Sequence, residues 1–123
     1  MNIINLTQHA QTAEQAKSAK FVIITAEKTA DIRALITFDE APTLAEMQER
    51  ARKLAQIATE HDVEYAMVGG APFFASTLEK ALLNAGITPV YAFSQREVVE
   101  NTSIDGAVTK TAIFKHAGWI RAV

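Results

Sequence analysis

The chain contains no cysteine, which excludes disulfide bonds, thiolate zinc sites and thiol nucleophiles. It has no strong excess of charge of one sign. The net charge of −2 excludes the broad basic surface of a duplex-binding protein. No apolar run is long enough to span a bilayer, and "MNIINLTQHA" lacks the basic flank and apolar stretch of a signal peptide. We therefore expect a cytoplasmic protein that binds neither duplex nucleic acid nor membranes.

The chain has 123 residues, of which 49% are hydrophobic and 21% charged. This length and composition predict one globular domain over residues 1–123. Runs such as "FVIITA" (21–26) are apolar without polar alternation, which is typical of parallel strands covered by helices on both faces. The predicted order is strand 2–6, a helix from 13, strand 21–26, helix 28–35, helix 44–61, strand 65–70, helix 73–85 and strand 88–94.

Two helix starts carry capping boxes, at Thr12 and at Thr43. The helix from residue 44 also places Glu46 and Arg50, and likewise Glu49 and Lys53, four residues apart, which favours exposed ion pairs. After residue 94 the pattern changes to two strand-like runs around Asp105-Gly106, which predict a hairpin extension over about residues 96–116. The closing "AGWIRAV" fits either a short strand or a tail packed on the sheet. The expected fold is therefore α/β, with a mostly parallel sheet flanked by helices and a C-terminal antiparallel β-hairpin.

Polar residues follow each of the predicted parallel strands. In such sheets, ligands bind beyond the carboxyl ends of the strands, near a switch in strand order. Parallel pairing would gather these side chains at one edge, which becomes the candidate ligand site. Its candidate ligand-binding residues are Thr7, Gln8, Gly69, Gly70, Pro72, Phe73, Ser94 and Glu97, with His9 and Arg96 as candidate catalytic residues.

The loop Gly69–Pro72 has two explanations that stay open at this point. Glycines let the backbone approach a bound group, and the amides at the start of the next helix favour an anion. The same glycines could serve only to fold the helix tightly onto the sheet. The loop matches neither the dinucleotide pattern G-x-G-x-x-G nor a Walker loop. Phe73 fits the core or a platform for a base.

His9 could act as a general base or donate to a phosphate, or it could simply hydrogen-bond its loop. Arg96 could hold a phosphate through two bonds, or form a surface ion pair with Glu97 or Glu100. The three histidines lack a short ligand spacing, so no metal site is expected. No cofactor is expected either. The position of Lys115 and His116 relative to the sheet edge stays open.

The opening "NIINLTQHA-QTAEQ" resembles the start of small Rossmann-like (CARF-type) proteins of type III CRISPR antiviral systems. There an apolar strand ends in a hydroxyl-and-histidine step, here Thr7 and His9, before a "T-x-E-Q" helix start, here Thr12, Glu14 and Gln15. Such proteins bind cyclic oligoadenylates, often as dimers, and some cleave them as ring nucleases. The resemblance implies that His9 and Arg96 contact phosphate or assist cleavage. A mobile-element relative that captures the nucleotide without cleaving it would look the same.

Three functional hypotheses follow. The first is a homodimeric, metal-independent ring nuclease acting on a cyclic oligoadenylate. The second is a sensor or sponge that uses the same pocket without turnover. The third is an interaction module in which the hairpin offers a strand edge to another protein.

Overall fold

The computed structural model of the chain describes residues 1–122, arranged as five strands and four helices. The elements in chain order are β1 (Asn2–Asn5), α1 (Ala13–Ser18), β2 (Lys20–Phe21), α2 (Ala26–Leu35), α3 (Leu44–Glu60), β3 (Tyr65–Met67), α4 (Pro72–Asn84), β4 (Thr88–Thr102) and β5 (Val108–Arg121).

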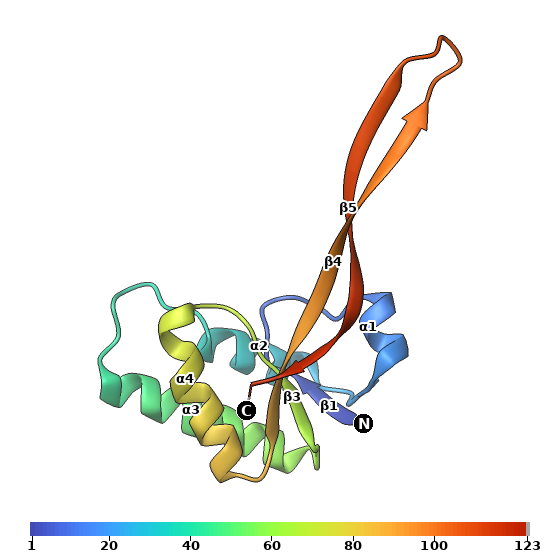
Figure 1. Cartoon of the computed structure of the whole chain (residues 1–123). Helices are drawn as coiled ribbons and strands as arrows, with labels where there is room; N and C mark the ends of the chain where they lie inside the picture. The colour runs from blue at the N-terminus through green and yellow to red at the C-terminus, as the bar shows by residue number, and fades with distance from the viewer. Residues whose placement is uncertain (123) are drawn as a thin grey trace.

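The five strands form one sheet in the order β2-β1-β3-β4-β5. The first four are mutually parallel, with registers such as Ile3 opposite Tyr65 and Tyr65 opposite Thr88. β5 runs antiparallel to β4 and closes a long hairpin. The chain is therefore a mixed α/β protein, which confirms the predicted parallel strands and the C-terminal hairpin (Figure 1).

Alternate residues of the short central strands enter two different apolar clusters. The larger cluster joins Ile4 and Val68 to buried side chains of α2, α3 and α4. The smaller one holds Ile3, Met67 and Val90, with Trp119 packed against them. Because successive strand residues point to opposite faces, α2–α4 cover one face of the sheet. α1 lies on the other side (Figure 1).

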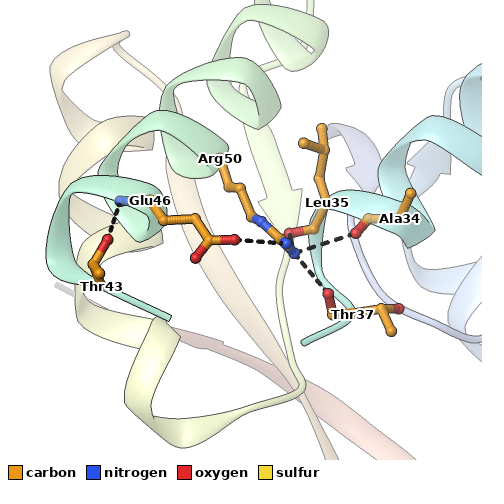
Figure 2. A network of polar contacts seen from close by, with 6 residues as sticks. All are labelled: Ala34, Leu35, Thr37, Thr43, Glu46 and Arg50. Carbon is orange, nitrogen blue, oxygen red and sulfur yellow. Dashed lines mark hydrogen bonds and ion pairs between the residues drawn. The ribbon is translucent and has the colours of Figure 1, made fainter. Parts of the chain in front are cut away.

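Arg50 fastens the turn between α2 and α3 from the first half of α3 (Figure 2). Its Nη1 donates to the carbonyl oxygen of Thr37 at 2.6 Å and, at 3.4 Å, to those of Ala34 and Leu35. Its Nη2 pairs with Glu46 at 3.0 Å, which confirms that predicted pair. The carbonyls at the end of α2, which have no partner inside their own helix, are thereby satisfied.

The predicted pair between Glu49 and Lys53 is wrong, since Glu49 holds Arg52 at 2.6 Å instead. Helix residues three and four positions apart lie on the same face, so the spacing allowed Glu49 to pair with either Arg52 or Lys53. The predicted capping box is confirmed at Thr12, whose hydroxyl accepts from the amide of Gln15 while the Gln15 side chain accepts from the Thr12 amide. At Thr43 only half of the box forms: the hydroxyl accepts from the amide of Glu46, but the Glu46 side chain pairs with Arg50.

The predicted strand over 21–26 is wrong in length and in burial. β2 has two residues and lies at the edge of the sheet, and the chain then leaves it. Val22 and Ile24 pack against the larger apolar cluster, whereas Ile23 is 96% exposed. An uninterrupted apolar run can thus belong to a segment that only crosses the edge of the sheet.

The predicted end of the last parallel strand at residue 94 is also wrong. β4 continues to Thr102, and β5 returns to Arg121. The closing segment "AGWIRAV" therefore belongs to β5 as far as Arg121. The hairpin projects from the rest of the chain as a two-stranded arm (Figure 1). We call residues 94–116 the arm. Among residues 1–122, no helix combines the length and apolar character needed to cross a membrane.

Candidate functional site

The loop after β1 is organised by one side chain, that of Asn5. Its Oδ1 accepts from the amide of Thr7 at 2.9 Å and from the Thr7 hydroxyl at 2.7 Å. Its Nδ2 donates to the carbonyl oxygen of His9 at 2.8 Å and to the Gln11 side chain at 3.1 Å. These bonds fix the backbone around an exposed His9. Asn5 was not among the predicted site residues, although asparagine is depleted in strands and stands here in an apolar run.

Gln8 lies in the same loop but turns towards α2. Its Nε2 donates to the Thr37 hydroxyl at 2.6 Å and to the carbonyl oxygen of Arg33 at 3.3 Å. The Gln8 side chain therefore ties the β1 loop to the end of α2. In this arrangement its amide group is engaged within the chain.

The loop after β3 lies directly against the loop after β1. The Leu6 amide donates to the carbonyl oxygen of Met67 at 2.9 Å, and the Thr7 methyl carbon lies 3.6 Å from the position of a Cβ on Gly69. β1 has β2 on one side and β3 on the other, so the strand order switches between β1 and β3. The structure thus brings Thr7 and Gly69 together at the switch, the place where open parallel sheets bind ligands.

The backbone of the glycine loop then turns into α4. Gly70 has φ +101°, a conformation that side-chain-bearing residues rarely adopt. Pro72 occupies the first turn of α4, as expected from the sequence. Within residues 1–122, no side chain caps the start of α4 at Ala71, and its first turn has no acidic residue. The amides of the glycine loop and of Phe73, together with the helix dipole, favour an anion in front of α4.

Phe73 lies in the first turn of α4 and is 55% exposed. Its ring packs edge-on against Phe38, with centroids 5.3 Å apart. Phe74, the next residue, is buried and contacts Phe38 as well. One part of the Phe73 ring is therefore used in packing, while about half of the residue remains open to solvent.

A cavity of about 330 Å³ opens on the other side of the β1 loop. It lies between this loop, the segment 21–24 and α2. Its polar lining comes from Asn5, Thr7, His9, Gln11, Thr29 and Arg33. Arg33 adds a cation that was not among the predicted site residues. No local signal could have found it, because three separate segments build the cavity.

Ser94, Arg96 and Glu97 lie on β4 where it enters the arm, opposite His116, Phe114 and Ile113 respectively. Arg96 and Glu97 are consecutive strand residues, so their side chains point to opposite faces of the arm. Glu97 pairs with Lys115 at 3.3 Å, and Glu100 with Lys110 at 3.6 Å. None of the ion pairs within residues 1–122 involves Arg96. Arg96 is two strands away from His9 across the sheet, since β3 lies between β1 and β4.

His116 fastens the base of the arm to α1. The Ser18 hydroxyl donates to the carbonyl oxygen of Gln15 at 2.8 Å and accepts from Nε1 of Trp119 at 3.1 Å. Because its only hydrogen is used, the contact of 3.1 Å with Nε2 of His116 makes that nitrogen the donor. The His116 amide also donates to Glu14 at 3.1 Å. Ser18 therefore serves as an anchoring hydroxyl in this cluster.

A larger hollow, of about 630 Å³, lies between α3 and α4. Small residues such as Ala51, Ala55 and Ala81 form part of it, together with the Arg52 that pairs with Glu49. This groove is separate from the carboxyl ends of the strands. In the described part of the chain, no three His, Asp or Glu side chains are grouped so as to hold a metal ion.

The fold and the site together define a class of protein: an α/β chain whose parallel strands present a glycine loop and a histidine loop at one sheet edge. The chain belongs to the uncharacterized protein MJ1673 family, whose model matches residues 1–120. None of the curated proteins and none of the solved structures compared with the chain matches it.

Proposed function

We propose that this chain is a Rossmann-like protein that binds a phosphate-containing nucleotide second messenger, cyclic oligoadenylate, at the carboxyl edge of its parallel strands. The observation that carries the proposal is that Thr7 lies beside Gly69 at the switch in strand order. Ligands of open parallel sheets bind in that crevice.

The groups around the crevice suit a phosphate. The amides of the glycine loop and of Phe73 supply fixed donors, whereas Pro72 has no N–H and the Phe74 amide donates to the carbonyl oxygen of Ala71. The helix dipole adds a favourable field. His9 and Arg33 line the adjoining cavity and supply cationic or donating groups. Thr7 lies between the crevice and the cavity, so a ligand with several phosphates can use both.

The class of nucleotide is proposed from the opening residues. The step from Thr7 to His9, followed by the helix start Thr12–Gln15, resembles that of CARF-type proteins that bind cyclic oligoadenylates. The exposed half of Phe73 offers a surface for an adenine ring beside the glycine loop. A two-fold symmetric homodimer suits a cyclic ligand with repeating units.

The catalytic form of the proposal is metal-independent cleavage. A ribose 2′-hydroxyl attacks the neighbouring phosphorus, the new P–O2′ bond forms and the P–O5′ bond breaks. His9 assists the transfer of the 2′-hydroxyl proton to the leaving 5′-oxygen. The loop amides, together with Arg33, which lines the same cavity as His9, stabilise the charge on the phosphate. The product is linear, with a 2′,3′-cyclic phosphate and a 5′-hydroxyl.

The binding-only form of the proposal rests on the position of Arg96. This residue lies on the arm, two strands across the sheet from β1, whereas His9 lies in the loop after β1. A single copy of the chain therefore offers the amides and His9 for binding without an adjacent arginine from β4. A sensor or sponge needs only those groups.

The test is incubation of the chain with cyclic tetra- and hexa-adenylate in the presence of EDTA, followed by chromatography of the bound and free nucleotides. Linear fragments that disappear with His9→Ala support cleavage, and tight retention of intact ligand supports the sponge. His61→Ala is the matched control, because His61 ends α3 at the opposite edge of the sheet. Absence of binding to either ring contradicts both forms.

A charge variant separates the site from the rest of the surface. Gly69→Glu introduces an anion into the crevice, and a Cβ there makes only ordinary contact with Thr7. We expect this variant to lose binding, whereas Asn84→Glu, with the same added charge at the far end of α4, keeps it. Equal loss in the two variants would contradict a site at the crevice.

A further inference from the structure

The arm is a two-stranded ribbon whose two outer edges run beyond the rest of the sheet (Figure 1). Every residue from 93 to 115 is exposed. Among them are Val98, 59% exposed, Phe114, 71% exposed, and Ile104, fully exposed. An isolated hairpin is only marginally stable in water, and an exposed strand edge is a template for another strand. The arm therefore has the form of an element that pairs with a further strand.

Two hydrogen bonds show which backbone groups of β4 face its free edge. The Val68 amide donates to the carbonyl oxygen of Val90, so Val90 faces β3. The Ser103 amide donates to the carbonyl oxygen of Ala107, so Ser103 faces β5. Successive strand residues direct their backbone groups to alternate sides. The residues of the arm whose backbone groups face the free edge of β4 are therefore Ser94, Arg96, Val98, Glu100 and Thr102.

The charges distinguish the two edges of the arm. β5 contains Lys110, Lys115 and Arg121 and no acidic residue, so two β5 edges would bring like charges together. On β4, Arg96 and Glu100 stand two residues on either side of Val98 and share one face. An antiparallel second β4 centred on Val98 would place each Arg96 directly opposite a Glu100. Within residues 1–122, Arg96 takes part in no ion pair of its own.

We infer that a second copy of this chain is the partner of the arm, and that the two β4 strands pair antiparallel about a two-fold axis at Val98. The result is a four-stranded sheet in the order β5-β4-β4-β5, continuous between the copies. Val98 meets Val98, Arg96 meets Glu100 twice, and Ser94 meets Thr102 twice. Such an isologous contact closes on itself and stops at two copies.

This pairing does not depend on any ligand, so it goes beyond the proposed function. It does have a consequence for the candidate site. In this register, the turn Ser103–Ala107 of the second copy lies alongside Phe93, just beyond the part of β4 that pairs with β3. The glycine loop follows β3, so the second copy comes close to the candidate site.

The absence of cysteine makes a direct test possible. In the proposed register the two Val98 residues form a hydrogen-bonded antiparallel pair, whose Cα atoms are about 5.5 Å apart. This distance lies within the range for a disulfide. Val98→Cys in the full chain, oxidised with copper phenanthroline, is expected to give a covalent dimer that a reducing agent dissolves. Ala112→Cys, opposite Val98 but on the other edge of the arm, is the matched control and is expected to stay monomeric.

Analytical ultracentrifugation of the chain without cross-linking measures its oligomeric state as a second readout. The wild-type chain is expected to sediment as a dimer and Val98→Pro as a monomer, because proline removes the amide that faces the second copy. Ala112→Pro removes an amide from the opposite edge and is expected to remain dimeric. Arg96→Glu is expected to weaken association by roughly tenfold through two like-charged pairs.

Three results would overturn the inference. They are a wild-type chain that is monomeric at every concentration tested, cross-linking of Ala112→Cys as readily as Val98→Cys, and a Val98→Pro variant that is still dimeric. Fluorescence of Trp119, at the base of the arm, shows in each variant whether the hairpin has formed.

Discussion

The methyl carbon of Thr7 lies 3.6 Å from the position that a Cβ atom of Gly69 would occupy. The loop after β1 therefore runs beside the loop after β3, and a Cβ atom added at Gly69 would make ordinary van der Waals contact with Thr7. The space at Gly69 therefore admits a methyl group. The requirement for glycine lies one residue later, at Gly70, where φ is +101°.

The two glycines should respond differently to the same substitution. Gly70→Ala should lower the free energy of unfolding by about 1–2 kcal/mol, because a side chain is strained at that φ. Gly69→Ala should change it by less than about 0.5 kcal/mol. Urea unfolding followed by circular dichroism measures both values. Equal losses would mean that the space beside Thr7 matters as much as the backbone angle of Gly70.

Asn5 should be important for stability although it is not in the core. Asn5→Ala removes the side chain that bonds Thr7 and His9, and it should lower the free energy of unfolding by about 1–3 kcal/mol. Asn84→Ala, at the exposed end of α4, should change it by less than about 0.5 kcal/mol. Thermal unfolding of the two variants makes the comparison. A stable Asn5→Ala protein would show that the β1 loop keeps its form without these bonds.

Comparison of Arg50 with Arg52, another arginine of α3, tests the carbonyl contacts of Arg50 that Figure 2 shows. Arg50→Ala should cost about 1.5–3 kcal/mol, since it frees the carbonyl of Thr37 and removes the guanidinium from above the Phe38 ring. Arg52→Ala removes only an exposed pair with Glu49 and should cost less than about 1 kcal/mol. Chemical denaturation distinguishes them. Similar losses would contradict a role for Arg50 beyond its pair with Glu46.

The stability of the turn at the tip of the arm should decrease at acid pH. The Ser103 hydroxyl and, next, the Ala107 amide donate to Asp105 and hold the pKa of that carboxyl below its usual value. Because the pKa is lower in the folded state, the ionised carboxylate stabilises the turn, and this stabilisation is complete at pH values above the unfolded-state pKa. The stabilisation is lost as pH falls through the folded-state pKa. NMR titration of the Asp105 carboxyl should show a low midpoint that rises in Ser103→Ala. An unchanged midpoint would show that the Ser103 hydroxyl does not lower the pKa of Asp105.

The parallel strands and the hairpin could be predicted because each has a local signal. Uninterrupted apolar runs between capped helices indicate buried parallel strands, and Asp105-Gly106 indicates a tight turn. The edge position of β2 has no such signal, because Val22, Ile23 and Ile24 look the same whether or not they pair. The polar run Ser94–Glu97 predicts a loop, but it lies within β4, because both faces of an exposed two-stranded ribbon can be polar.

The candidate site was predictable only in part, for a related reason. Thr7, His9 and the glycine loop follow strands directly, so the parallel arrangement is enough to place them at one edge. Arg33 reaches the cavity from a helix far along the chain, and Asn5 acts from within a strand. Neither position is marked by its neighbours in sequence. Arg96 was expected at the same edge because β4 was expected to end before it.

The measurement that most directly tests the central claim is an NMR titration of the ¹⁵N-labelled chain with cyclic tetra-adenylate. The account predicts saturable shifts of the backbone amides of Thr7, His9, Gly69, Gly70 and Phe73. It also predicts unchanged amides along the groove between α3 and α4. Shifts confined to that groove, or none at ligand concentrations well above that of the protein, would contradict a nucleotide site at the crevice between the β1 and β3 loops.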